Sequence, residues 1–167
     1  MNDLNLTVSF TGHRNFRLSE ASCLERTLEL LYRQGKRRFM SGMAVGFDLA
    51  AAEAVLALRQ KYEDVKLVAV VPFEGHDARF STQDQARFAR ICREADRVEV
   101  LSKGYAPEVY ALRNDFLVDH AQTLVAWYDG SAGGTAYTVR RALRLNRRLI
   151  HLHPRTPLDA YPEPSLF

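Results

Sequence analysis

The chain has 167 residues, of which 47% are hydrophobic and 26% are charged, as is usual for a globular protein with a sizeable core. Its formal net charge of +3 slightly favours anionic ligands but is too small to indicate a nucleic-acid-binding tail. The apolar runs are too short to span a membrane, no signal peptide is visible, and Cys23 and Cys92 lack disulfide or metal spacing. We therefore expect a reduced, cytoplasmic protein without a membrane partner.

Short β-branched apolar runs alternate with helical patterns along the chain, which predicts parallel strands joined by helices. The expected strands cover residues 6–10, 38–41, 66–71, 97–101, 124–128 and 148–152. Several lack polar alternation, as strands do when helices cover both faces of a sheet. The prediction is a Rossmann-like α/β fold, a mostly parallel open sheet with helices on both faces, in one domain over residues 1–167. The run at 97–101 could be an edge strand or a connector.

The helical patterns predict five helices, over residues 19–34, 47–61, 82–93, 107–121 and 134–146. The first could begin at Ser19 or Ser22, because Ser22 and Glu25 match a capping box, and Gly35 is a stop signal. Asn146 is a suitable residue for the end of the last helix. Residues 154–167 hold four of the six prolines, which predicts an irregular C-terminal tail.

Ligands of open parallel sheets bind beyond the carboxyl ends of the strands, near the point where the strand order reverses. Four segments are expected at that edge: residues 11–14, 41–48, 72–76 and 129–135. Glycine-bearing turns before helices expose backbone N–H groups at the positive end of the helix dipole, where phosphate or carboxylate binds. We therefore expect these segments to form one site for an anionic ligand.

Each of these features also has a purely structural interpretation. Gly42 and Gly46 could simply allow a turn and close helix packing, while Asp48 and Thr135 could cap their helices. Asp129 could form an Asx turn instead of binding a ligand hydroxyl. His13 and Arg14 could belong to a surface turn with an ordinary ion pair, although arginine suits bidentate phosphate contacts.

Among the aromatic residues, Trp127 and Tyr128 should lie on opposite faces of the sheet, so at most one can stack on a base. Phe73 is a rival stacking candidate. Two pairs of potential metal ligands occur, His76 with Asp77 and His151 with His153. Each pair lacks a third ligand nearby, so no metal site is predicted.

The other charged residues are interpreted as solvated. We expect Glu53 to form a solvent-exposed pair. Five arginines (140, 141, 144, 147 and 148) should form a solvated helix end, with a nucleic-acid patch as the alternative.

Three motifs together resemble the SMF/DprA–LOG (SLOG) superfamily, and most of all its YpsA-like branch. These are TGHR at 11–14, SGMAVGFDLAAAE at 41–53, which is similar to the SGxAxGxDxxA signature of DprA proteins, and the segment 111–139 with its Arg-Asn helix, strand and GGT turn. The resemblance covers residues 6–152. It implies a Rossmann-like fold that binds a nucleotide or a nucleotide-derived ligand, for which AMP, NAD and ADP-ribose are suitable probes; no resident cofactor is assigned.

The resemblance also bears on catalysis and on partners. LOG-type phosphoribohydrolases use an arginine, for which Arg113 is the counterpart, and a loop glutamate, where this chain has Thr138. Without that carboxylate, LOG-type hydrolysis is not expected. Hydrolysis of the N-glycosidic bond of a nucleoside monophosphate is the alternative if another carboxylate, Asp48 or Asp129, reaches a bound ribose. DprA handles single-stranded DNA, but no aromatic and basic groove is visible in this sequence. Many family members pair, and the apolar helix at 109–117 could serve as an interface.

The resemblance and the turn chemistry together define a set of candidate ligand-binding residues: Thr11, Gly12, His13, Arg14, Ser41, Gly42, Gly46, Asp48, Pro72, Phe73, Arg113, Asn114, Asp129, Gly133, Gly134 and Thr135.

Overall fold

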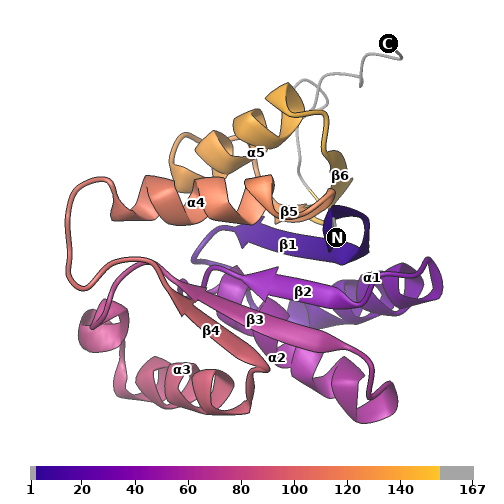
Figure 1. The fold of residues 1–167 in the computed structure, drawn as a ribbon, viewed down its shortest axis with the longest axis horizontal. Coiled ribbons are helices and arrows are strands. Elements are labelled where there is room, and N and C mark those ends of the chain that lie inside the picture. The colour runs from indigo at the N-terminus through magenta and orange to yellow at the C-terminus, as the bar shows by residue number, and fades with distance from the viewer. Residues whose placement is uncertain (1–2, 155–167) are drawn as a thin grey trace.

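The computed structural model describes residues 3–154 and contains one sheet of six strands in the order β4-β3-β2-β1-β5-β6 (Figure 1). Every neighbouring pair is parallel. The strands are β1 (Thr7–Gly12), β2 (Arg38–Ser41), β3 (Lys66–Val71), β4 (Arg97–Val100), β5 (Thr123–Trp127) and β6 (Arg148–His151). This arrangement confirms the predicted Rossmann-like α/β fold, and it makes the segment at 97 an edge strand and not a connector. Most of the predicted irregular tail, residues 155–167, lies outside the described residues.

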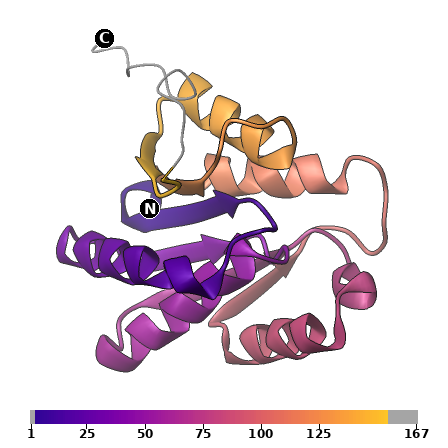
Figure 2. The ribbon, with the colours of Figure 1, turned by 180° about the vertical axis from the view of Figure 1, so that it is seen from behind.

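Five α-helices cover the sheet within these residues, in two groups on opposite faces (Figures 1 and 2). One group is α1 (Ala21–Arg33), α2 (Phe47–Lys61) and α3 (Thr82–Glu94), and the other is α4 (Val109–Asp119) and α5 (Gly134–Arg144). Strands β1 to β4 follow one another outward, and the chain then returns to place β5 on the free side of β1. Because crossovers between parallel strands are right-handed, this reversal puts the later helices on the other face.

The core differs between the two faces of the sheet. On the α1–α3 side, the rings of Phe10, Phe39 and Phe47 form the centre of the largest cluster. Alanines 50–52 of α2 are buried and let this helix approach the strands closely. Trp127 belongs to this cluster, while Tyr128 packs with α5 on the other face, as the alternation along the strand predicts.

The positions at which α1 and α5 end agree with the sequence prediction, but the position at which α1 begins does not. Gly35 (φ +97°) and Asn146 (φ +57°) each lie just after a helix in a left-handed conformation, with the paired backbone hydrogen bonds of a Schellman motif. The predicted capping box of Ser22 and Glu25 is wrong. Helix α1 begins one residue earlier, after Glu20, and no side chain caps it, because a short 3-10 helix (Leu18–Glu20) leads directly into the first turn.

Two further 3-10 helices lie at Asp3–Leu6 (η1) and His76–Arg79 (η3). Among residues 3–154, none of the helices combines the length and the apolar character that crossing a bilayer requires.

Candidate functional site

A pocket of about 320 Å³ lies at the carboxyl ends of β1 and β5, between which the strand order reverses. We call it the anion pocket. It is lined by Thr11, Gly12, His13, Arg14, Ala44, Asp48, His76, Tyr110, Arg113, Asn114, Leu117, Gly134 and Thr135. Nine of the sixteen predicted residues are in this wall, and all four predicted segments contribute to it. The tertiary structure therefore brings together residues as far apart in sequence as Thr11 and Thr135.

Arg113 of α4 supplies a buried positive charge to the pocket. Its side chain is only 7% exposed. Its Nη1 donates to the carbonyl of Gly42 at 2.6 Å and its Nε donates to Oδ1 of Asn114 at 2.9 Å. Both acceptors are neutral, Nη2 has no hydrogen-bond partner among the described residues, and no described carboxylate forms an ion pair with the guanidinium. The buried carboxylate of Asp48 interacts electrostatically with Arg113 without forming an ion pair, so the guanidinium is only partly compensated and an anion beside it would be favourable.

Asp48, in the first turn of α2, is the buried carboxylate of the pocket and is 5% exposed. Its Oδ2 accepts from the backbone N–H of Ala44 at 3.3 Å, while Oδ1 is buried without a hydrogen-bond partner. Burial raises the pKa of Asp48 to about 6, although Arg113 and the Ala44 N–H partly oppose that rise. The expectation that Asp48 caps α2 is wrong: Gly46 is the N-cap, and Asp48 lies within the helix.

Three glycines shape the pocket through their lack of a Cβ. A Cβ on Gly12 would lie 2.4 Å from the Phe47 ring, and one on Gly42 would lie 2.7 Å from Cδ of Arg113. Gly46 (φ +84°) packs against the backbone of Arg14, 2.4 Å from where its Cβ would be. The turn around Gly42 and Gly46 therefore fits closely against the loop after β1 and against α4, and the two glycines do not themselves line the pocket.

The first strand ends later than predicted, because it includes Gly12 and Thr11. They belong to β1 and pair with Trp127 and Ala126 of β5, since the strand continues two residues past Phe10. Consequently the loop proper begins at His13.

The start of α5 is uncapped by any side chain. Its N-cap is Gly133 (φ +139°), so the predicted cap Thr135 lies inside the first turn instead. Gly134 and Thr135 line the pocket, and Asn114 approaches to 3.6 Å from where a Cβ on Gly134 would be. The free N–H groups and the dipole of this 11-residue helix thus add positive potential to the same pocket.

His13 and Asp129 bind each other across the pocket rim. Nε2 of His13 lies 2.8 Å from Oδ1 of Asp129. The same oxygen accepts from the backbone N–H and the hydroxyl of Ser131, at 2.9 and 2.6 Å, which is the Asx-turn alternative of the sequence. These bonds from Ser131 are the main reason that the pKa of Asp129 falls to about 2. Asp129 is thereby occupied by its own loop and does not line the pocket.

Other predicted residues have structural roles or lie elsewhere. The hydroxyl of Ser41 is buried and donates to the Asp48 carbonyl at 2.8 Å. Pro72 is buried and Gly133 is exposed; neither lines the pocket. Thr138, which replaces the LOG glutamate, donates to the carbonyl of Gly134 at 2.8 Å within its own helix.

Comparisons with known proteins agree with the fold. The YpsA family model, described as the YspA SLOG family, matches residues 8–151. The chain belongs to the YpsA family of SLOG proteins. The SPbeta prophage-derived protein YoqJ of Bacillus subtilis (strain 168) is 32% identical over 140 residues, which cover 75% of this chain and 82% of YoqJ. The UPF0398 protein SSP1297 of Staphylococcus saprophyticus is 33% identical over 136 residues, 74% of this chain and 72% of the relative.

Solved structures share the fold at lower identity. The DNA processing protein A (DprA) of Streptococcus pneumoniae has a TM-score of 0.68 at 20% identity and covers 96% of this chain, which spans only 55% of that protein. DprA of Helicobacter pylori, described by its single-stranded DNA binding mode, has a TM-score of 0.65 at 18% identity, over 89% of this chain and 66% of its own. The molybdenum cofactor carrier protein of Chlamydomonas reinhardtii has a TM-score of 0.56 at 16% identity, covering 92% and 79%.

A second cavity of this YpsA-family protein, of about 690 Å³, adjoins the anion pocket and shares Arg14, Ala44, His76 and Tyr110 with it. We call it the aromatic cavity, because Phe73, Phe80, Tyr105 and Tyr110 also line it. Phe73 was among the residues predicted from the sequence, whereas Tyr105 and Tyr110 were not. The signal that could have found Tyr105 is its position in the loop that follows β4 at the same sheet edge.

His76 separates the two cavities and is 8% exposed. Its Nε2 lies 3.1 Å from the Met43 carbonyl, so Nε2 carries the proton, and Nδ1 is buried without a partner. Burial, assisted by the nearby Arg113, lowers the pKa of His76 to about 4. Within the described residues, no group of three or more His, Cys, Asp or Glu side chains is placed to hold a metal ion.

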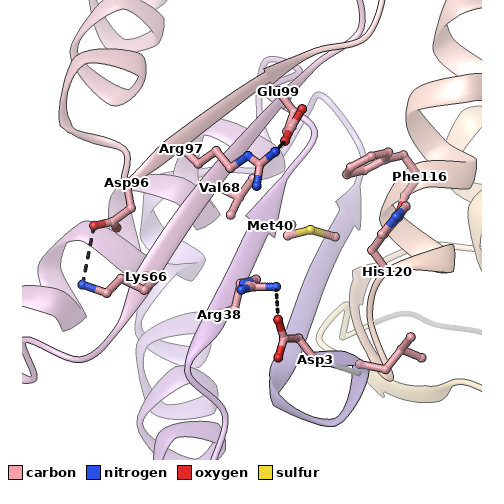
Figure 3. A pocket seen from close by; sticks show the side chains of 11 residues that line it. Asp3, Arg38, Met40, Lys66, Val68, Asp96, Arg97, Glu99, Phe116 and His120 are labelled. Atoms are coloured by element: carbon pink, nitrogen blue, oxygen red, sulfur yellow. Dashed lines mark hydrogen bonds and ion pairs between the residues drawn. The ribbon is translucent and has the colours of Figure 1, made fainter. Parts of the chain in front are cut away.

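Another cavity, of about 580 Å³, lies over β2, β3 and β4 beside the C-terminal part of α4 (Figure 3). Its charges pair with one another: Arg38 with Asp3 at 3.0 Å, Lys66 with Asp96 at 3.9 Å, and Arg97 with Glu99. None of the predicted residues lines it. Since its charges pair with one another, this cavity offers less unpaired positive charge than the anion pocket, where Arg14 and Arg113 form no ion pair within residues 3–154.

The arginine run at the end of α5 is used largely within the fold. Arg141 binds Asp119 through two hydrogen bonds of 3.0 Å, and Arg147 donates to the Val118 carbonyl at 3.0 Å. These contacts join α4 to α5, which the solvated-face interpretation did not foresee. Glu53 pairs with Arg87 of α3 and does not line the anion pocket; the pair is partly buried and not solvent-exposed as expected.

Proposed function

We propose that this YpsA-family protein binds a nucleotide or a nucleotide-derived small molecule, with its phosphate in the anion pocket. The observation that carries the proposal is the buried guanidinium of Arg113, which has no carboxylate partner and lines the wall together with Arg14. The uncapped start of α5 supplies further donors to the same wall. Membership of a SLOG family and the position at the strand-order reversal are both consistent with this ligand class.

The pocket offers three kinds of positive group to a phosphate. Arg113 is held in place by Gly42 and Asn114, so it binds without losing much side-chain entropy. Arg14 is exposed and forms no ion pair within residues 3–154, so it is free to close on the ligand. Backbone N–H groups at Gly134 and Thr135 would complete the set, as in other phosphate sites at helix N-termini.

Calorimetric titration with AMP, NAD and ADP-ribose tests the proposal. Arg14→Ala should weaken the binding of the best ligand by about tenfold or more, because a hydrogen bond to a charged group contributes about 1.5–3 kcal/mol. Arg93→Ala is the matched control, since Arg93 is an exposed arginine on α3 away from the pocket. No binding of any of the three ligands at millimolar concentration, or an equal effect of both variants, would reject the proposal.

One observation favours a second candidate function, the hydrolysis of the N-glycosidic bond of a nucleoside monophosphate. The unpaired Asp48 carboxylate lines the same pocket, and a pKa of about 6 suits a general acid or base near neutral pH. Asp129, the other carboxylate considered from the sequence, is occupied by Ser131 and His13. Chromatographic detection of free base, abolished in Asp48→Asn, would support hydrolysis; intact nucleotide after prolonged incubation would contradict it.

A further inference from the structure

The aromatic cavity is built around three rings from two loops. Phe73 follows β3, while Tyr105 and Tyr110 come from the β4–α4 loop and the first turn of α4. The Phe73 ring centre lies 5.7 Å from that of Tyr105 and 6.1 Å from that of Tyr110, with interplanar angles of 77° and 75°. The phenylalanine thus packs edge-on against both tyrosines and holds them in position.

The two tyrosines remain open to solvent although they are large aromatic residues. Tyr105 is 66% exposed and Tyr110 is 37% exposed. Neither tyrosine donates or accepts a side-chain hydrogen bond within the described residues. Tyr110 also packs against His76, whereas Tyr105 leaves most of its ring exposed. Exposed aromatic faces held in fixed positions at the edge of a cavity are suited to stacking on a planar ligand ring.

The aromatic cavity adjoins the anion pocket. Tyr110 lines both cavities, and the guanidinium carbon of Arg113 lies 5.7 Å from the centre of its ring. Arg14 and His76 also line both. A ligand whose planar group lies against Tyr105 and Tyr110 would therefore carry its anionic group toward Arg14 and Arg113 without leaving the protein surface.

We propose that the aromatic cavity is the base-binding subsite of the ligand in the anion pocket, so that the heteroaromatic base of a nucleotide stacks on Tyr105, while Tyr110, whose ring is tilted by 59° from that of Tyr105, lies against the edge of the base. This proposal rests on the proposed function and specifies how the aromatic cavity recognises the base. The base is held by its π-face, and the phosphate by the arginines and the start of α5. Stacking is tolerant of base identity, so the expected preference is for nucleotides over sugar phosphates, with little distinction among bases.

A comparison of AMP with ribose 5-phosphate separates the subsite from the anion pocket. Calorimetry on the wild type should show that AMP binds about tenfold more tightly, because stacking on one aromatic side chain contributes about 1–3 kcal/mol per base. Tyr105→Ala should remove most of that difference and leave ribose 5-phosphate unchanged. Tyr105→Phe keeps the ring and is the matched control, expected to bind AMP like the wild type. Because Tyr105 is largely exposed, these variants should fold normally.

A fluorescent analogue gives an independent readout of stacking. The emission of 1,N6-ethenoadenosine monophosphate should be quenched on binding to the wild type and to Tyr105→Phe, and much less on binding to Tyr105→Ala. Equal affinity of AMP and ribose 5-phosphate, with no effect of Tyr105→Ala, would overturn the subsite while the phosphate site stands. Absence of binding by both compounds would overturn the subsite together with the proposed function.

Discussion

Asp48→Asn should remove a dependence of this protein's stability on pH, so that the variant gains stability relative to the wild type as the pH rises from 4 to 7. In the folded state the Asp48 carboxyl is buried, Oδ1 has no partner, and the pKa is about 6. In the unfolded chain an aspartate has a pKa of about 3.9. Between these values the folded protein binds a proton that the unfolded chain does not, so the free energy of unfolding of the wild type falls as pH rises through this window.

The size of the effect follows from the difference between the two pKa values. A difference of about 2 corresponds to ~3 kcal/mol, since each pKa unit is equivalent to about 1.4 kcal/mol. Asparagine keeps an oxygen for the Ala44 N–H but has no proton to lose. Its amide group leaves a buried donor unpaired, which costs about 1–3 kcal/mol at every pH and so does not affect the slope.

Urea unfolding of both proteins at half-unit steps from pH 4 to pH 8 measures the effect. Relative to the difference at pH 4, the variant should gain up to ~3 kcal/mol by pH 7, or roughly 6–12 °C in melting temperature for a chain of this size. Other titrating groups are common to both proteins and cancel in the difference. The reasoning would be refuted if the difference in the free energy of unfolding between variant and wild type does not change with pH, or if the variant loses stability relative to the wild type as the pH rises. Either result would show that Arg113 fully compensates the Asp48 carboxylate.

Further changes test the packing of the site and its second buried titratable group. Gly12→Ala places a Cβ 2.4 Å from the Phe47 ring and should lower the free energy of unfolding by about 1–3 kcal/mol in urea, whereas Gly104→Ala, with nothing within 4 Å, should change it by less than about 0.5 kcal/mol. Gly42→Ala should displace Arg113, whose Cδ lies 2.7 Å from the new Cβ, and calorimetry should show at least about a tenfold loss of AMP affinity. The pKa of His76 is about 4 in the folded protein and about 6.5 in the unfolded chain, so the free energy of unfolding of the wild type should fall as the pH drops from 6.5 to 4. His76→Gln should lack this loss. If urea unfolding shows the same pH dependence for both proteins, the burial argument is contradicted.

Local sequence patterns were sufficient for the elements and for the approximate position of the site. Alternating apolar and helical runs predicted six strands and five helices, because burial on a sheet imposes a period that can be read along the chain. Gly35 and Asn146 marked helix ends, because few residues adopt the left-handed conformation that such ends require. The small residues near the ends of β1, β2 and β5 predicted turns at the carboxyl edge. Gly12, Gly134 and Thr135 line the anion pocket and Gly42 and Gly46 pack behind it, whereas Gly133 does neither.

The partners of each side chain depended on the tertiary structure. From the sequence, Asp129 and Asp48 were equivalent candidates, yet one is bound by Ser131 and His13 and the other is buried without a partner for Oδ1. For Tyr105 the sequence offered only its position in the loop after β4, because its contact with Phe73, 32 residues earlier in the chain, forms only in the tertiary structure.

Periodicity reports only how a residue is buried within its own element. Which elements become neighbours depends on the return of the chain from β4 to the free side of β1, and that crossing brings Arg113 against Gly42 and the start of α5 beside both. The charge balance of the pocket is therefore a property of the assembled sheet.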